Sequence, residues 1–307
     1  MSIASQNVLD YPNNNTIFIV WNFKEGMAIK EAFKSLCALV TNLNNSANTR
    51  FPNARASVVL GIGFDAWHLL ELPTPVPKEF VAFAPIEGAK YTAVSTRGDL
   101  HLHIRSDAYS FCIDAASAIA DTLKDVASSL DEVHGFRYWD SRSILGFVDG
   151  TENPHGADRA YFGIIGDEDP VYKGGSYLFV QKYLHDLQAW KALPVSEQEK
   201  VIGRSKSDDI EMPDGVKPSN AHSALANVGD DLKIVRDNMP FGNVSTNEMG
   251  TYFIAYASSF ITVKKMLTNM FVGVPEGNYD RILDFSTPQT GSLFFVPTFE
   301  MLDSFGS

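Results

Sequence analysis

The sequence has only two cysteines among its 307 residues, Cys37 and Cys112. Both lie in apolar segments with helical spacing, so we interpret them as small buried side chains rather than as a disulfide. The N-terminal residues 1–7 have neither the basic nor the apolar segment of a secretory signal. These absences exclude a disulfide scaffold and predict a cytoplasmic protein.

Long hydrophobic runs and an excess of basic residues are also missing. No apolar run approaches the roughly 20 residues that a membrane-spanning helix needs, so no membrane association is expected. Lys and Arg total 25 against 37 Asp and Glu, which gives a formal net charge of -12. This charge repels phosphate backbones, so nucleic acid is not expected as a partner. With 45% hydrophobic residues the chain can bury a substantial core, and its length allows two domains.

The first half has the hydrophobic patterns of alternating strands and helices. Strands are predicted from short β-branched and aromatic segments, and helices from apolar residues at helical spacing. In chain order we expect a strand at 16–22, a helix at 28–43, strands at 56–62, 91–95 and 100–105, a helix at 109–133 and a strand at 134–138. The turn at 96–99 would join the middle pair of strands. This β-α-β-β-α-β order is typical of ferredoxin-like domains.

The second half is predicted to repeat this order. We expect a strand at 176–183, a helix at 184–193, strands at 232–236 and 250–258, a helix at 260–269 and a strand at 292–296. The sequence therefore predicts an α+β protein with one ferredoxin-like domain at 1–140 and another at 141–307. The polar segment at 194–225 is too long for a plain connection, and it ends near His222, which favours a ligand-binding loop.

The stretch GFVDGTENP at residues 146–154 has two interpretations. Asp-Gly and Asn-Pro are turn dipeptides, so the stretch can be a simple turn. Alternatively, the turn holds the carboxylate of Asp149 at the edge of an apolar cavity, because Phe147 and Val148 precede it. A carboxyl group in such surroundings can act as a general acid or base.

The histidines differ in their sequence surroundings. His101 and His103 alternate with apolar residues and share one face of a strand, but a metal site there lacks an evident third ligand. The others, apart from His222, are interpreted as surface or core residues: His68, His134, His155 and His185. His222 follows the long polar segment and precedes an apolar one.

Two further charged residues stand next to apolar segments. Arg236 ends a predicted strand, where it can point into a pocket or form a surface salt bridge. Asp284 lies between Leu283 and Phe285, where it either faces water or is buried with a partner such as a histidine. One His, one Arg and two Asp in an aromatic-rich chain suit a haem site, because haem iron needs only one protein ligand. No Cys-x-x-Cys-His motif for covalent haem attachment is present.

At this point the chain resembles the dye-decolorizing peroxidases. GFVDG at 146–150 matches the GxxDG motif of that family, and His222, the RDNMPFG segment at 236–242 and the ILDFST segment at 282–287 follow in the same order. The resemblance covers nearly the whole chain and is greatest to the compact bacterial B-type subgroup.

The resemblance implies two ferredoxin-like domains that form a dimeric α+β barrel-like unit, with haem b in the C-terminal domain. It implies that His222 is the proximal iron ligand and that Asp284 is its hydrogen-bond partner. Asp149, Arg236 and Asn238 would be catalytic residues on the distal face. Further haem contacts are implied for Arg204, Gly150 and Thr151.

The resemblance also implies an activity. The protein would reduce hydrogen peroxide through a compound I intermediate and oxidise dyes, phenolics or porphyrinogens. Asp149 would move the peroxide protons, and Arg236 would stabilise developing negative charge. Electrons from bulky reductants would pass through aromatic side chains, or these side chains are ordinary packing: Tyr183, Trp190, Tyr252 and Tyr256.

Three functions remain as hypotheses. The first is a haem peroxidase that uses hydrogen peroxide and small aromatic or porphyrin-type reductants. The second is a haem-handling protein that binds haem, traffics it or releases its iron. The third is a non-haem binding or structural module, which the four motifs disfavour. We expect a homo-oligomer, and the short C-terminal end at 305–307 predicts no tail for packaging into a protein shell.

Overall fold

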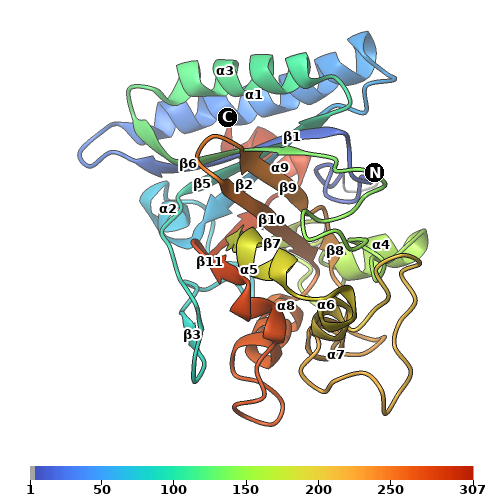
Figure 1. Cartoon of the computed structure of the whole chain (residues 1–307). Coiled ribbons are helices and arrows are strands. Elements are labelled where there is room, and N and C mark those ends of the chain that lie inside the picture. Colours follow the sequence, from blue (N-terminus) through green and yellow to red (C-terminus); the bar gives the residue numbers. More distant parts are fainter. Residues whose placement is uncertain (1–3, 307) are drawn as a thin grey trace.

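The N-terminal half of the computed structural model, which describes residues 4–306, forms one split βαβ unit. Its elements are β1 (Asn15–Phe23), α1 (Ile29–Arg50), β2 (Ser57–Gly63), α2 (Phe64–Leu69), β3 (Ile86–Glu87), β4 (Thr92–Ala93), β5 (Leu100–Ser106), α3 (Tyr109–Leu123) and β6 (Ala127–Phe136). The four long strands are antiparallel in the order β2-β5-β1-β6. This is the strand order of a ferredoxin-like domain, as the sequence predicts. Helices α1 and α3 lie side by side on its outer face (Figure 1).

The C-terminal half repeats the arrangement with more additions. Its elements are α4 (Ala157–Gly163), β7 (Ser176–His185), α5 (Leu187–Ala192), α6 (Val195–Ile202), α7 (His222–Ala226), β8 (Val235–Arg236), β9 (Met239–Asn243), β10 (Glu248–Ala257), α8 (Phe260–Phe271), the 3-10 helix η1 (Arg281–Asp284), β11 (Ser286–Pro288), β12 (Ser292–Val296) and α9 (Phe299–Phe305). The long strands have the equivalent order β12-β7-β10-β9. The α+β class is therefore confirmed.

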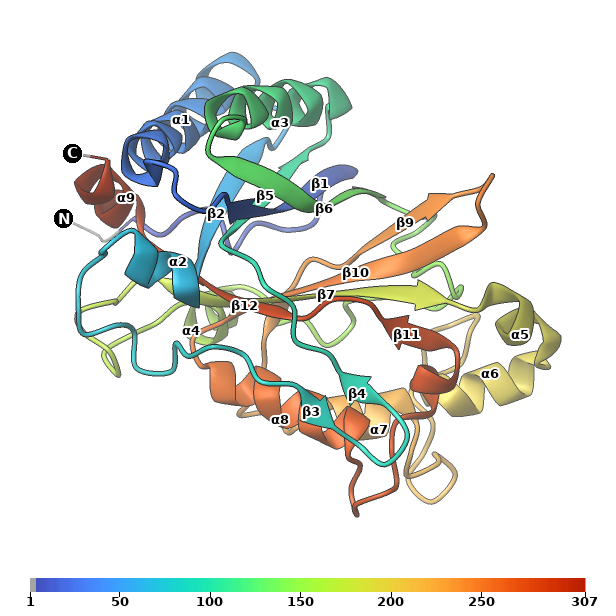
Figure 2. The same cartoon turned by 90° about the vertical axis from the view of Figure 1, so that its left-hand side faces the viewer.

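The two halves share one closed sheet. Strand β12 pairs with β2, and β6 pairs with β9, so the ring runs β7-β12-β2-β5-β1-β6-β9-β10 and returns to β7. The short strands β8 and β11 extend it at the edges of β10 and β7. Figure 2 shows α1 and α3 on one side of the strands and α7 and α8 on the other.

Closure explains why the ring strands are so apolar. One face of each strand points into the ring, and much of the other face packs under helices, so both faces are buried. Strand β1 is buried along nearly its whole length. Helix α3 packs against β1, and helix α1 packs against the nearby strand β2. The buried face of α1 includes Phe33, Leu36, Cys37 and Val40, which recur at helical spacing. Cys37 and Cys112 are buried and free, as predicted.

Two predictions in the first half are wrong. The helix expected at 109–133 ends at Leu123, because β6 pairs with β1 along its length and these ladder hydrogen bonds outweigh local helical preference. The strands expected at 91–95 and 100–105 do not form a hairpin. Instead β4 pairs with β3 in a separate two-stranded ribbon, and β5 lies between β1 and β2.

The second half also differs in detail from the prediction. Strand β9 was not predicted, because Pro240 and Gly242 are poor strand formers. The helix expected at 184–193 begins only at Leu187, since β7 continues to His185. The polar segment at 194–225 is helical at its start. Helix α6 occupies Val195–Ile202, and its C-cap is Gly203, with φ 88°.

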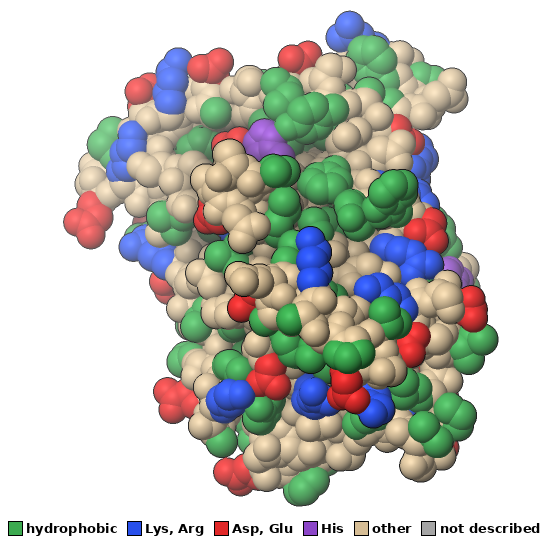
Figure 3. Space-filling model, viewed as in Figure 1, with side chains coloured by type: hydrophobic (Ala, Val, Ile, Leu, Met, Phe, Trp, Pro, Cys, Tyr) green, Lys and Arg blue, Asp and Glu red, His purple; other side chains and the backbone are tan. Residues whose placement is uncertain are grey.

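The surface and the helices agree with the composition. Acidic and basic side chains are interspersed on the face that Figure 3 shows. Within residues 4–306, each helix is too short or too polar to cross a membrane.

Candidate active site

A cavity lies between the outer face of the C-terminal strands and helices α7 and α8. Two neighbouring spaces, of about 820 Å³ and about 970 Å³ including open solvent, share Asp149, His222 and Arg236 in their walls. The inner space is mostly apolar and is lined by Leu145, Phe147, Ile202, Phe253, Val263, Met266, Leu267, Met270 and Ile282. The structure therefore brings three of the candidate residues from the sequence analysis together around one cavity.

His222 is the first residue of α7, and a buried carboxylate holds its ring. Its Nδ1 lies 2.7 Å from Oδ2 of Asp280, whose side chain is 0% exposed while that of His222 is 29% exposed. The other oxygen of Asp280 accepts a hydrogen bond from the Ile282 backbone N–H at 2.9 Å. The carboxylate is thus fixed from both sides, and Nε2 of His222 is left as the nitrogen that can bind a metal.

Two opposing effects act on the His222 imidazole. Burial lowers its pKa, but the charge of Asp280 and the hydrogen bond to it outweigh burial, so the pKa is raised above the ordinary value of 6.5. A carboxylate at this position favours a proton on Nδ1 of His222, directed at Asp280.

The predicted hydrogen bond between His222 and Asp284 is wrong. Asp284 accepts hydrogen bonds from Lys90 at 2.7 Å, from Tyr91 at 2.8 Å and from Tyr279 at 3.1 Å. Asp280 takes the role because residues 281–284 form a 3-10 helix with Asp280 as its N-cap, and the Asp280 carboxylate reaches Nδ1 of His222. An Asp directly before a short helical turn is a capping signal, and this signal could have identified Asp280 from the sequence.

Asp149 faces the cavity from the loop after β6. The side-chain amide of Asn238 donates to both of its carboxylate oxygens, at 3.3 Å and 3.2 Å. The amide is oriented by its oxygen, which accepts from the Ile254 backbone N–H at 3.1 Å. Phe147, two residues earlier, is buried against Trp190. Buried Phe147 thus anchors the loop, and Asp149 two residues later lies at the cavity wall, which agrees with the second interpretation of this stretch in the sequence analysis.

The main chain of Arg236, which lines the same cavity as Asp149, is held by a residue that the sequence interpretation missed. The side chain of Asn153 accepts from the Arg236 backbone N–H at 2.8 Å and donates to its carbonyl oxygen at 2.9 Å. One amide thereby forms both hydrogen bonds that a neighbouring strand would form with β8. In the sequence Asn153 precedes a proline and has the pattern of a turn residue, so nothing there marked this role.

The remaining candidates lie at the opening of the cavity. Gly150, Thr151 and Arg204 line the outer space. Arg204 donates to the Asp209 carboxylate at 2.7 Å, and Thr151 donates to the same carboxylate at 2.5 Å. Gly150 has φ 88°, a conformation that a side chain would strain.

His101 and His103 share a face of β5 as predicted, but that face points into the ring, away from this cavity. Each is hydrogen-bonded to a tyrosine hydroxyl. Among residues 4–306, no group of three or more His, Cys, Asp or Glu side chains could hold a metal ion.

Two family models match consecutive parts of the chain. "Dyp-type peroxidase, N-terminal" matches residues 6–137, and "Dyp-type peroxidase, C-terminal" matches residues 140–301. The chain belongs to the dye-decolorizing peroxidase family. It is an enzyme of that type.

Individual members of the dye-decolorizing peroxidase family are similar over most of their length. A dye-decolorizing peroxidase of Rhodococcus erythropolis is 49% identical over 94% of this chain and 84% of its own. The crystal structure of one from Bacteroides thetaiotaomicron superimposes with a TM-score of 0.97 at 50% identity, over 100% of this chain and 99% of that chain. A variant of Rhodococcus jostii RHA1 DypB in complex with heme gives 0.91 at 42% identity, over 98% of both chains.

Proposed function

We propose that this chain is a haem-dependent peroxidase that reduces hydrogen peroxide and oxidises dyes, phenolics or porphyrinogens. One observation carries the proposal. Asp149, Arg236 and the anchored imidazole of His222 line the same cavity. Family membership supports the same activity.

The residues fit haem b. Haem requires one axial ligand, an apolar slot and polar groups at its edge. The cavity offers a single imidazole whose Nδ1 is already bound, walls of aliphatic and aromatic side chains, and Arg204 at the opening. We assign Nε2 of His222 as the iron ligand and Gly150, Thr151 and Arg204 as contacts at the porphyrin edge. When bound, haem supplies the redox chemistry that these side chains cannot.

The protein side chains then move protons and stabilise charge. Asp149 takes the proton from the inner peroxide oxygen and returns it to the outer oxygen, which leaves as water. Asn238 keeps the Asp149 carboxylate in one orientation. The guanidinium of Arg236 stabilises the negative charge that develops as the O–O bond breaks, an effect worth roughly 3–4 kcal/mol for a well-placed donor.

A haem reconstitution followed by one addition of peroxide tests the proposal. We expect a Soret band that changes within seconds, and substrate oxidation that Asp149→Ala or Arg236→Leu lowers at least roughly 100-fold. If the absorption spectrum of the haem-loaded protein does not change after peroxide is added, peroxidase function is contradicted. Release of porphyrin or iron without peroxide would instead favour the alternative, a haem-handling protein with incidental peroxidase activity.

Three finer assignments are part of the proposal. The boundaries 1–140 and 141–307 are supported by the match limits at 137 and 140. Similarity to DypB supports the B-type subgroup. We also propose a cytoplasmic location, because the composition and the two free, buried cysteines suit a reducing compartment. A homo-oligomer is proposed as well, from the resemblance to the family. Sedimentation of the haem-loaded protein tests the oligomer.

A further inference from the structure

Another cavity is lined by Asp149 and Arg236 but not by His222. It has a volume of about 1000 Å³ including open solvent, and it shares Asp149, Arg236 and Asn238 with the inner space of the active-site cavity. Asp149 is the one acidic side chain that lines it, against five arginines: Arg55, Arg137, Arg142, Arg159 and Arg236. We call it the arginine cavity. In a chain of formal net charge -12, it is a local concentration of positive charge.

Two of these arginines are neutralised by carboxylates outside the cavity lining. Arg55 donates to both oxygens of Asp107, at 2.8 Å and 2.9 Å. Arg142 donates to Asp140 at 2.9 Å. The other three form no ion pair within residues 4–306: Arg137, Arg159 and Arg236. A cavity with several unneutralised guanidinium groups attracts anions.

Arg159 is the most deeply buried of these three arginines. It is 3% exposed, and its side chain donates to main-chain carbonyl oxygens, of Leu9 at 2.8 Å, Pro154 at 3.3 Å and Asp10 at 2.9 Å. Its guanidinium carbon lies 4.3 Å from the ring centroid of Tyr11. Burial lowers the pKa of Arg159, which is the effect expected of a positive charge that its surroundings do not fully compensate.

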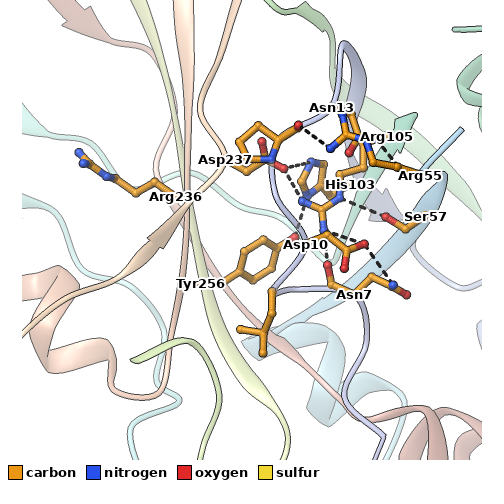
Figure 4. A network of polar contacts seen from close by, with 12 residues as sticks. Asn7, Asp10, Asn13, Arg55, Ser57, His103, Arg105, Arg236, Asp237 and Tyr256 are labelled. Atoms are coloured by element: carbon orange, nitrogen blue, oxygen red, sulfur yellow. Dashed lines mark hydrogen bonds and ion pairs between the residues drawn. The ribbon is translucent and has the colours of Figure 1, made fainter. Parts of the chain in front are cut away.

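The carboxylates whose charges act on Arg159 are already bound to another arginine. These carboxylates belong to Asp10 and Asp237. Arg105 forms an ion pair with Asp237 and a second one, at 3.7 Å, with Asp10 (Figure 4). Arg105 is itself completely buried and does not line the arginine cavity. The positive charge of Arg159 is therefore left for an anion inside that cavity.

Arg236 also reaches the arginine cavity without a carboxylate partner. Figure 4 shows Arg236 and Asp237 extending to opposite sides of their strand, and no hydrogen bond or ion pair joins the Arg236 guanidinium to the residues drawn. The neighbouring strand β10 alternates in the same way. Its Thr251 and Phe253 line the inner space, while Tyr252 between them points into the ring. Asp237, the next residue in the sequence, therefore cannot neutralise Arg236.

Arg137 lies at the outer end of the arginine cavity. It is exposed, it directly follows β6, and its backbone N–H donates to the carbonyl oxygen of Asn14 at 2.8 Å. Its side chain forms no hydrogen bond in the part of the chain that the structure describes. Asp149 and Asn238 border the inner space instead, so they mark the inner end. A ligand held by Arg137 can therefore extend inwards to Asp149.

The remaining walls of the arginine cavity suit a flat ring. They include the side chains of Tyr11, Pro12, Tyr138, Met239 and Pro240. Aromatic and apolar walls of this kind bind planar ligands by stacking and burial. Hydrogen peroxide is small and neutral, so its entry needs neither these walls nor the arginines. The combination fits an organic anion with an aromatic ring.

We propose that the arginine cavity binds a phenol that carries a carboxylate, as a reducing substrate of the enzyme. The carboxylate pairs with Arg137 in the field of Arg159 and Arg236, and the phenol hydroxyl extends towards Asp149. Two such molecules, bound in turn, each give up one electron and the phenol proton. These reduce one hydrogen peroxide to two waters and leave two phenoxyl radicals. The inference rests on the proposed peroxidase function, which supplies the oxidant.

The test compares para-hydroxyphenylpropionate with its methyl ester. Saturated carbons separate the carboxylate from the ring, so the two molecules carry the same phenol and differ in charge. Calorimetric titration of the haem-loaded protein without peroxide should give a dissociation constant roughly tenfold lower for the carboxylate. This preference should shrink at high ionic strength, because salt screens the attraction. Acetate, which lacks the ring, should not compete at the same concentration.

Arg137→Gln should reduce the preference for the carboxylate at least roughly threefold, because the ion pair is lost. The ratio of kcat/KM for the carboxylate to that for the ester, measured with hydrogen peroxide, should fall by the same factor. Arg50→Gln is the matched control. It removes the same charge from the exposed end of α1, and Arg50 does not line the arginine cavity. Both ratios should then equal those of the unmodified protein.

The possible outcomes separate this site from the peroxidase function. Equal affinity for carboxylate and ester, an unchanged preference in Arg137→Gln, or an equal loss in Arg50→Gln overturns the site and leaves peroxidase function intact. Displacement by acetate overturns the requirement for an aromatic ring. If the carboxylate binds as expected but peroxide leaves the haem spectrum unchanged, peroxidase function fails, and the role of the carboxylate as reductant fails with it. Thermal unfolding of each variant verifies that loss of binding is not loss of fold.

Discussion

At the scale of single residues, the proposed haem site depends on the His222–Asp280 pair. Asp280 holds Nδ1 of His222, and its own position is fixed by the 3-10 helix that it caps. A carboxylate bonded to an iron-ligating imidazole makes that ligand more basic. In the proposed haem site, the pair would therefore control the electron density that His222 gives to iron.

Replacing Asp280 with Asn tests this control. The amide oxygen of Asp280→Asn can still accept from Nδ1, so haem should remain bound. The negative charge is lost, so we expect a higher iron reduction potential and a peroxide reaction slower by roughly 10–100-fold. Spectroelectrochemical titration and stopped-flow absorbance measure the two effects.

Asp284→Asn is the matched control for this variant. Its carboxylate bonds Lys90, Tyr91 and Tyr279 rather than His222, so potential and rate should stay near those of the unmodified protein. Equal shifts in the two variants would mean that Asp280 has no special role.

The sequence analysis identified the charged residues and the histidine of this site correctly, but it assigned the wrong hydrogen-bond partner to His222. His222, Asp149 and Arg236 were expected around one cavity, and they lie there. The resemblance placed the partner of His222 four residues too late, at Asp284, and no helical turn was predicted at residues 281–284. A single helical turn of four residues leaves almost no periodic signal, so only the capping preference of Asp280 pointed to it.

At the scale of elements, the loop between β6 and α4 carries Asp149 and is tied to β8. Asn153 forms two hydrogen bonds with the Arg236 main chain, and Phe147 packs against Trp190. The loop therefore ties the main chain of Arg236 to the segment that carries Asp149. An element without regular secondary structure thus has a defined position.

We expect Asn153→Ala to loosen this connection. Two hydrogen bonds to the main chain are lost, which should lower the free energy of unfolding by about 1–3 kcal/mol. The reaction with peroxide should slow as well, because the main chain of Arg236 is no longer tied to the segment that carries Asp149. Urea unfolding and stopped-flow absorbance provide the two measurements.

Asn48→Ala on the exposed side of α1 is a suitable control, since Asn48 is exposed and lies in the other half of the chain. The interpretation fails if Asn153→Ala loses stability but reacts with peroxide at the unmodified rate.

Most elements were predictable where one pattern dominates. β12 was predicted at its observed bounds, Ser292–Val296, because a short apolar run next to turn residues suits a buried strand. Residues 127–133 of β6 were taken for the end of a helix and only its last residues for a strand, and β9 was missed. Both strands lie where the two halves pair with each other, at Gly135 and Phe241. Such pairing depends on residues more than 100 positions away, which no local pattern contains.

At the scale of the whole molecule, the closed sheet buries polar groups from both halves in one interior. His101 comes from β5 and its partner Tyr252 from β10, so the pair forms only when the halves are joined. Burial keeps the imidazole neutral. The interior network therefore links the stability of the whole ring to pH.

The sign of this linkage follows from the lowered pKa. In the folded protein the pKa of His101 is about 3, against 6.5 as the ordinary value. Between pH 6.5 and pH 3, His101 is protonated in the unfolded chain but remains neutral in the folded chain. The stabilising contribution is thus complete above pH 6.5 and is lost progressively as pH falls towards 3.

We expect the protein to take up protons on unfolding at pH 5, and His101→Gln to lower that uptake by close to one proton. Calorimetric unfolding in buffers of different ionisation enthalpy measures the number directly. An unchanged uptake in His101→Gln would show that this imidazole is already charged in the folded state.

The strict alternation of side chains along β10 has a consequence for how this chain can diverge. Gaining or losing one residue there would turn Tyr252 and Tyr256 towards the haem slot and send Thr251 and Phe253 into the ring. The insertion or deletion of a single codon would therefore disrupt both the haem slot and the interior of the ring. Insertions and deletions are therefore expected to accumulate in the loops at the ends of β10, while the length of the strand between them stays constant.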